Sequence, residues 1–286
     1  MGDYPNWPRK TLIYNKHNSP TGRVSIMDKL KKIEAFSENY RNLLTSETLS
    51  FREAGSWAKV RQDWWLALIF FFDRAFYQGR NDKISSYFEQ ATIKALSDVL
   101  PGLSSSKRLS SLRGLSHWLN REQWRSQRNP FWEALSKKYD IADGKKSGTG
   151  RERDREMVLS SLNFIVNHCK DYNILEYSIR YIESGEIGRL SNELHNIVSV
   201  GDKIASFFLR DTVFVYDLET YLKPEDYCYV VPIDTWVGKV ADKLGIETNA
   251  KAIAIACQQN GVSPIKFDQG AWYLGSHSFQ VLLDML

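Results

Sequence analysis

Cysteine is scarce in this sequence: three residues among 286, Cys169, Cys228 and Cys257, lie far apart in the chain. They form no Cys-x-x-Cys pair and no group of four, so they cannot build a structural zinc site or a four-cysteine iron–sulfur cluster. A small, odd number of cysteines is typical of reduced thiols, which favours a cytoplasmic protein.

Long hydrophobic runs are missing as well. The longest extends from Trp64 to Phe72 and is far shorter than the roughly 20 apolar residues that a membrane-spanning helix needs. The first ten residues, MGDYPNWPRK, contain no apolar stretch of the kind found in signal peptides. We therefore expect neither export nor a membrane as a partner.

The motifs of several enzyme classes are absent. The sequence has no GxxxxGK[ST], GxSxG or HExxH pattern, which argues against P-loop, α/β-hydrolase and zinc-protease chemistry. The segment Gly148-Thr-Gly150 lacks the third glycine of a dinucleotide-binding loop. The five histidines are scattered, so we expect no metal site and no resident cofactor.

The residues that are present make an ordinary globular balance, 43% hydrophobic and 25% charged, with nine tryptophans and a net charge of +4. The positive charge is concentrated between Lys107 and Arg155, where 13 Lys and Arg stand against 6 Asp and Glu, a net of +7. Three tryptophans are interleaved with three arginines in this segment: Trp118, Trp124 and Trp132 with Arg121, Arg125 and Arg128. The segment is either a solvated basic face over an aromatic core or a surface that contacts phosphates.

Apolar residues recur at three- and four-residue steps through most of the chain, a spacing that is typical of helices. Residues 227–233 are the single segment that we expect to be extended. The sequence therefore predicts an all-α fold. The expected helices span residues 28–44, 57–76, 82–99, 131–139, 154–169, 172–183 and 186–197.

The stretch from Leu190 to Leu244 carries the strongest candidate chemistry. An amphipathic helix ends at the turn Ser199-Val200-Gly201, where we expect Gly201 to adopt a conformation that a side chain would forbid. A second apolar helix follows, with Asp202 as its expected cap and Lys203 in its first turn. A helix N-terminus disfavours a cation and so favours the neutral amine that a nucleophile needs. Lys203 is therefore either a nucleophile or an ordinary surface lysine.

Asp234 directly precedes a helical stripe of apolar residues that ends before Gly245. This place in the pattern is that of an N-cap residue. Capping alone would explain the aspartate, and a carboxylate in an active site is the alternative.

Together these segments resemble the helix-hairpin-helix DNA glycosylase superfamily. In that family a hairpin ending in Val-Gly-x-Lys presents a catalytic lysine, and a downstream segment supplies a catalytic aspartate. The matching residues here are Val200-Gly201-Asp202-Lys203 and Pro232-Ile233-Asp234-Thr235-Trp236. The gap between the two segments is similar to that of the archaeal 8-oxoguanine glycosylase branch, whereas the missing cysteine cluster argues against the endonuclease III branch. The resemblance covers about residues 55–280.

The resemblance implies two helical subdomains with a cleft between them, and it places further site residues. Gln78 and Arg80 fall where the family has a loop that wedges into the duplex. Trp272, with Trp236 as the second choice, falls where an aromatic ring stacks on the extruded base, although either tryptophan could equally be core.

The hairpin residues Ser199, Val200 and Gly201 would hold a DNA phosphate through their backbone N–H groups. The family's usual first hairpin glycine is Ser199 here, a departure that weighs against the backbone-bound monovalent cation of the family.

The function that the resemblance implies is base excision in DNA repair. The expected enzyme is a monomer that binds double-stranded DNA, flips out a damaged base, most simply 8-oxoguanine, and forms a Schiff base through Lys203 with associated β-lyase activity. Alternatives are excision of alkylated or hypermodified bases, as in defence against phage, and a non-catalytic helix-hairpin-helix DNA-binding protein. We assign residues 1–50 to an N-terminal extension and first helices and residues 51–286 to the glycosylase domain, with the hairpin at about 186–215 and a basic loop at about 141–155.

Overall fold

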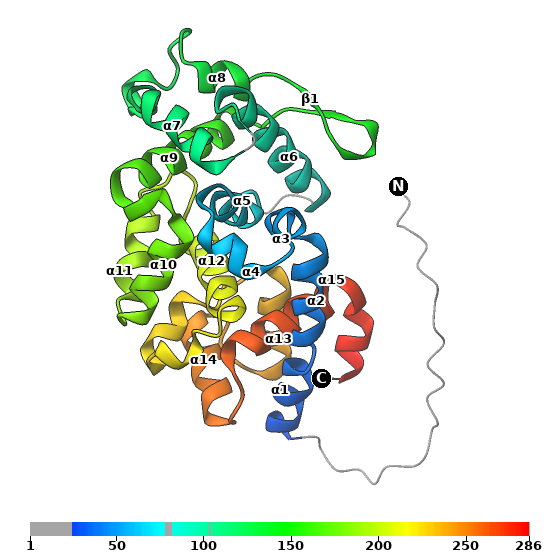
Figure 1. The fold of residues 1–286 in the computed structure, drawn as a ribbon. Helices are drawn as coiled ribbons and strands as arrows, with labels where there is room; N and C mark the ends of the chain where they lie inside the picture. Colours follow the sequence, from blue (N-terminus) through cyan, green and yellow to red (C-terminus); the bar gives the residue numbers. More distant parts are fainter. Residues whose placement is uncertain (1–24, 78–81, 103, 286) are drawn as a thin grey trace.

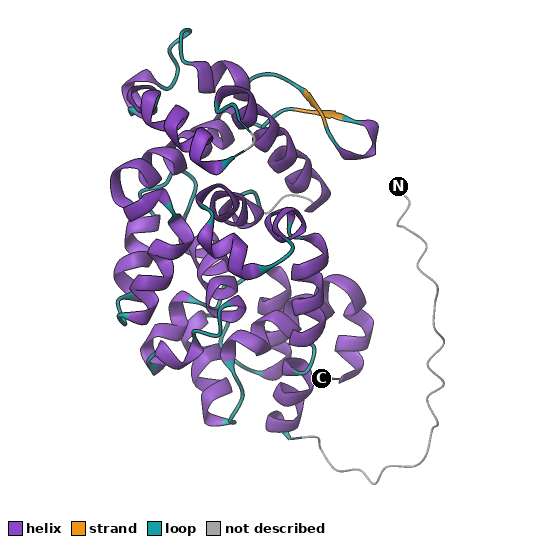
Figure 2. Cartoon of the chain, viewed as in Figure 1, coloured by secondary structure: helices purple, strands orange, loops and turns teal. Residues whose placement is uncertain are grey.

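The computed structural model describes residues 25–77, 82–102 and 104–285 of the chain, and in these ranges it is almost entirely helical (Figures 1 and 2). The all-α class predicted from the sequence is therefore confirmed. Among the described helices, none is both long and apolar enough to span a bilayer. The α-helices are α1 (Ile26–Glu34), α2 (Ser37–Glu47), α3 (Leu49–Ala54), α4 (Trp57–Gln62), α5 (Trp64–Ala75), α6 (Asp82–Val99), α7 (Ser105–Gly114), α8 (Pro130–Leu135), α9 (Glu152–His168), α10 (Ile174–Glu183), α11 (Ile187–Leu194), α12 (Asp202–Val215), α13 (Thr235–Leu244), α14 (Ala250–Gln259) and α15 (Pro264–Met285).

Two of the predicted helices are each divided in the structure. The expected helix over 57–76 breaks at Asp63, whose side chain accepts hydrogen bonds from the N–H groups of Trp65 (2.9 Å) and Leu66 (3.1 Å) and so starts α5 afresh. The expected helix over 28–44 breaks between α1 and α2. In both cases the apolar stripe continues across the break, which is why its period did not reveal the break.

The extended segment expected at residues 227–233 is not a strand. Pro224–Tyr229 form a 3-10 helix instead. The only strands in the described ranges are β1 (Tyr139–Asp140) and β2 (Lys146–Ser147), an antiparallel pair in which Tyr139 faces Ser147. This short hairpin occupies part of the segment that the sequence assigned to a basic loop.

Buried apolar side chains form two cores. The larger core is built around α5, in which every residue except Leu66 is buried, as its all-round hydrophobicity predicts. The smaller core joins α1 with α13, α14 and α15, so the first described helix packs against the last (Figure 1). Residues before 51 contribute to both cores, Leu30 and Ile33 to the smaller and Tyr40 and Leu44 to the larger.

A buried network of charged groups ties four helices together. Arg210 of α12 is 1% exposed, and it donates to Asp211 on the same helix (2.9 Å) and to Asp268 of α15 (2.6 Å). Arg74 of α5 also donates to Asp211, and the Tyr40 hydroxyl of α2 donates to the same carboxylate (3.0 Å). Buried charges are tolerated when they are paired and hydrogen-bonded in this way. The network fixes α12 against α2, α5 and α15.

Candidate active site

The hairpin between α11 and α12 turns through Ser199. The N–H of Val200 donates to the carbonyl oxygen of Ile197 (3.0 Å), and Ser199 has a φ of 66°, in the left-handed region. This pattern is a turn that favours glycine at the position of Ser199. Gly201, by contrast, is extended, and a Cβ added there would meet nothing within 4 Å. The prediction that Gly201 makes the turn is therefore wrong, and the strained position is the serine.

Two side chains of α9 hold this hairpin. The N–H of Val198 donates to the Ser160 hydroxyl (3.0 Å). The Nε of Arg153 donates to the Ser199 hydroxyl (2.8 Å). Because Arg153 belongs to the segment between Lys107 and Arg155, the basic segment reaches the hairpin.

Lys203 lies in the first turn of α12 and is half-buried. Its Nζ stands 5.5 Å from the centroid of the Phe207 ring, one turn further along the helix. The prediction that Asp202 caps this helix is wrong, because no side chain caps it; the Asp202 side chain is 97% exposed and pairs with Nε2 of His195 (3.3 Å). The lysine therefore follows a helix start without a side-chain cap.

Asp234 caps α13, as predicted. Its Oδ1 accepts hydrogen bonds from the N–H groups of Trp236 and Val237, both at 2.8 Å. Burial raises the pKa of this carboxyl group, while the Val237 and Trp236 N–H groups and the charges of Arg210 and Lys203 lower it. The influence of Lys203 means that the two residues predicted to be catalytic lie within electrostatic reach of each other.

Asp82 is a third charged group here, and sequence reasoning missed it. It begins α6, and burial raises its pKa, as does the charge of Asp234, whereas Lys203 and His277 lower it. The sequence indicated only that a helix starts at Asp82. Its position within electrostatic reach of Lys203 and Asp234 depends on how α6 packs against the rest of the fold.

A cavity of about 650 Å³, within the usual range for small-molecule sites, is lined in part by Asp82. Phe207 lines it as well, whereas Lys203 and Asp234 are not among its lining residues. Trp272 also lines it and meets Tyr40 edge-on, with ring centroids 5.5 Å apart. The remaining described lining residues come mainly from α2, α3, α5 and α6, among them Leu44, Leu49, Asp73, Arg74, Tyr77, Tyr87 and Glu89.

Of the two tryptophans proposed to stack on a base, only Trp272 lines this cavity. Trp236 packs against α15, where a Cβ added to Gly275 would lie 2.6 Å from the Trp236 Cβ. The Nζ of Lys239 lies 4.7 Å from the centroid of the Trp236 ring. The proposed wedge residues Gln78 and Arg80 lie outside the described residues.

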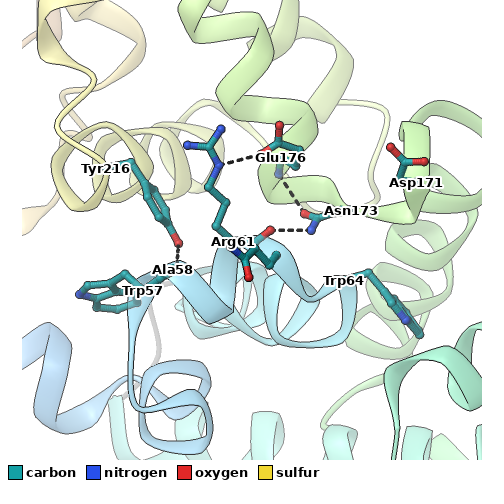
Figure 3. A pocket seen from close by; sticks show the side chains of 9 residues that line it. Trp57, Ala58, Arg61, Trp64, Asp171, Asn173, Glu176 and Tyr216 are labelled. Carbon is teal, nitrogen blue, oxygen red and sulfur yellow. Dashed lines mark hydrogen bonds and ion pairs between the residues drawn. The ribbon is translucent and has the colours of Figure 1, made fainter.

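A second cavity, of about 630 Å³, lies at the other end of α12 (Figure 3). Its polar groups bond to one another: Arg61 donates to Glu176 (2.7 Å), Asn173 to the carbonyl oxygen of Arg61 (2.8 Å), and Tyr216 to that of Trp57 (2.9 Å). Tyr216 and Lys203 are separated by most of the length of α12, about 20 Å. The second cavity is therefore a packing feature, apart from the candidate site.

No group of three or more His, Cys, Asp or Glu side chains in the described ranges is arranged to hold a metal ion. Comparison of the chain with protein-family models, with curated proteins and with solved structures found no match in any of the three.

Proposed function

We propose that this chain is a DNA glycosylase of the helix-hairpin-helix type, with a lysine nucleophile and associated β-lyase activity, acting in base excision repair. The observation that carries the proposal is that Lys203, in the first turn of α12, and Asp234, at the N-cap of α13, lie within electrostatic reach of each other.

The substrate of such an enzyme is a base inside a DNA duplex, which has to be extruded before it can react. Extrusion costs a few kcal/mol, and stacking on an aromatic ring returns roughly 1–3 kcal/mol per base. Trp272 is the ring that we assign to this role because, of the two candidate tryptophans, it is the one that lines the cavity. Oxidised guanine is the first candidate, and alkylated or hypermodified bases are the next.

Breaking the bond between base and sugar leaves positive charge on the sugar. The Asp234 carboxylate, held by two backbone N–H groups through Oδ1, is fixed in position and would stabilise this charge electrostatically. Such fixed groups need no reorganisation when the charge develops. The electron pair of the broken bond leaves with the base, which takes up a proton.

The Lys203 amine would then bond to C1′ of the sugar, and opening of the sugar ring gives a protonated Schiff base. Loss of a proton from C2′ expels the 3′ phosphate, which is the β-elimination step, and water finally releases the lysine. The amine lies over the Phe207 ring, 5.5 Å from its centroid.

Contacts to the DNA backbone would come from the hairpin and the basic segment. N–H groups at the start of α12 suit a phosphate without reading sequence. The bond between Arg153 and Ser199 supports this assignment, because it places a cation at the same hairpin.

The experiment that tests the proposal is a single-turnover panel of duplexes, each carrying one oxidised, alkylated or hypermodified base, incubated with wild type and with Asp234→Asn. We expect wild type to release at least one of these bases and Asp234→Asn to be slower by about 100-fold or more, with affinity for abasic-site DNA retained. If the protein bound DNA but released none of these bases, the proposed enzymatic function would be wrong and a non-catalytic DNA-binding role would be favoured.

A further inference from the structure

The larger cavity is elongated and follows α6. Its lining residues on this helix begin with Asp82 and end with Lys94, twelve positions later. Because an α-helix rises about 1.5 Å per residue, the cavity follows α6 for about 18 Å. The opposite wall is formed by residues of α2 and α3, which lie below α6 in Figure 1.

The proposed nucleophile lies toward the Asp82 end of this cavity. The charge of Lys203 lowers the pKa of Asp82, so the two are within electrostatic reach, and Lys203 lies over the ring of Phe207, which lines the cavity. His277 also lowers the pKa of Asp82, and its ring meets that of Trp272 with centroids 6.2 Å apart. Phe207 and Trp272 therefore belong to the same end of the cavity as Asp82.

The other end of the cavity is closed by the β1–β2 hairpin. Lys94 donates a hydrogen bond to the carbonyl oxygen of Asp140, and the N–H of Ala142 donates to Oε1 of Gln90 (3.1 Å). Gln90, Lys94 and Ala142 all line the cavity. The cavity thus continues from the Asp82 end to a hairpin that lies two to three helical turns further along α6.

The walls of the cavity carry accessible polar groups of both signs. Three cationic and three acidic lining residues are exposed: Arg52, Lys83, Lys94, Glu47, Glu53 and Asp82. Ser86 and Tyr87 are half-buried and add hydroxyl groups. A long alkyl chain would desolvate these groups without bonding to them, which is unfavourable, and an anionic group would meet the acidic residues. A neutral group with several hydroxyls suits these walls better, because each hydroxyl can both donate and accept.

We infer that this cavity takes a base that carries a large hydroxylated substituent, such as a sugar joined to a pyrimidine through a hydroxymethyl group. The base stacks at the Trp272 end, and the substituent extends along α6 toward Ala142. A base without a substituent is one or two rings and would occupy only one end of the cavity, whose volume of about 650 Å³ is that of a site for a drug-sized ligand. This inference rests on the proposed function and selects, among the bases named there, the hypermodified ones.

The test uses four duplexes of one sequence that differ at a single base: cytosine, 5-hydroxymethylcytosine, glucosylated 5-hydroxymethylcytosine or 8-oxoguanine. Single-turnover base release and binding affinity are measured for the full chain and two variants. Ala142→Trp fills the hairpin end of the cavity, and because Ala142 is exposed, the variant should fold. Ala35→Trp is the matched control, since Ala35 is an exposed alanine at the C-cap of α1 and is not among the lining residues.

We expect wild type to release the glucosylated base about tenfold faster, or more, than the other three, a comparison that needs no variant to fold. Ala142→Trp should reduce this preference about tenfold, and Ala35→Trp should leave it unchanged. Release of 8-oxoguanine or 5-hydroxymethylcytosine as fast as the glucosylated base, or the same preference in wild type and a folded Ala142→Trp, or an equal loss in both variants, would overturn this inference alone. Release of no base, with the glucosylated duplex bound more tightly by wild type than by Ala142→Trp, would reject the proposed function alone. Release of no base with equal binding of all four duplexes would reject both.

Discussion

The Nε of Arg153 lies 2.8 Å from the Ser199 hydroxyl, so the most basic segment of the chain is bonded to the turn that leads into Lys203. Arg153 is otherwise exposed at the start of α9. The sequence showed both features but did not relate them, because 46 residues separate Arg153 from Ser199. Their contact places one cation of that segment at the turn four residues before the candidate nucleophile.

The first prediction concerns this contact. Arg153→Gln should weaken binding to duplex DNA to a similar degree for every sequence, because a phosphate contact carries no sequence information. It should also reduce the slope of log affinity against log salt concentration by about 1. Titrations at several salt concentrations measure both quantities. Lys243→Gln is the control, since Lys243 is exposed in the last turn of α13, away from Asp234, and an equal effect of the two variants would contradict the assignment.

The second prediction concerns pH. Burial raises the pKa of Asp234 above the ordinary value of about 3.9. The proposed role needs the carboxylate, so single-turnover base release should fall as pH is lowered through this raised pKa, at a higher pH than an exposed aspartate would give. Rate profiles of wild type and Asp234→Asn measure this, and the variant should be slow and lack this acidic limb.

Asp202→Asn provides the comparison for the pH profile. Asp202 is fully open to solvent and close to Lys203 in sequence, yet it caps nothing. Its loss should leave the profile unchanged. If Asp234→Asn kept the wild-type profile, Asp234 would have no part in base release.

The third prediction concerns stability. Arg210→Met leaves Asp211 with one cation fewer and Asp268 without its buried partner, so the free energy of unfolding should fall by about 3–5 kcal/mol. Chemical denaturation followed by circular dichroism measures the loss. Arg189→Met, which breaks exposed ion pairs on α11, should leave the value nearly unchanged. Equal stability of Arg210→Met and wild type would show that the buried network is not needed for the fold.

The sequence predicted well those features that depend on local pattern. The helix at 82–99 has the predicted bounds, and Asp234 is the cap that its position suggested. The break at Asp63 was missed because an apolar stripe runs through it. The strands β1 and β2 were missed because two residues each are too few to alternate.

The candidate site was predicted only in part, because much of it depends on how helices far apart in the sequence pack together. Lys203 and Asp234 could be selected by motif, and in the structure they lie within electrostatic reach of each other. Asp82 and Glu89 look like ordinary positions of one helix in the sequence, and only the packing of α6 brings them to the cavity. The left-handed Ser199 was missed because glycine, and not serine, is the usual mark of such a turn.

The most direct test of the central claim is borohydride trapping on a duplex that contains an abasic site, since this probe is independent of which base is excised. Wild type and Lys243→Gln should form a covalent complex with the DNA, Lys203→Gln should form none, and mass spectrometry of the digested complex should place the sugar on Lys203. Trapping of Lys203→Gln as efficient as that of wild type, or a crosslink on another residue, would contradict the assignment of Lys203 as the nucleophile.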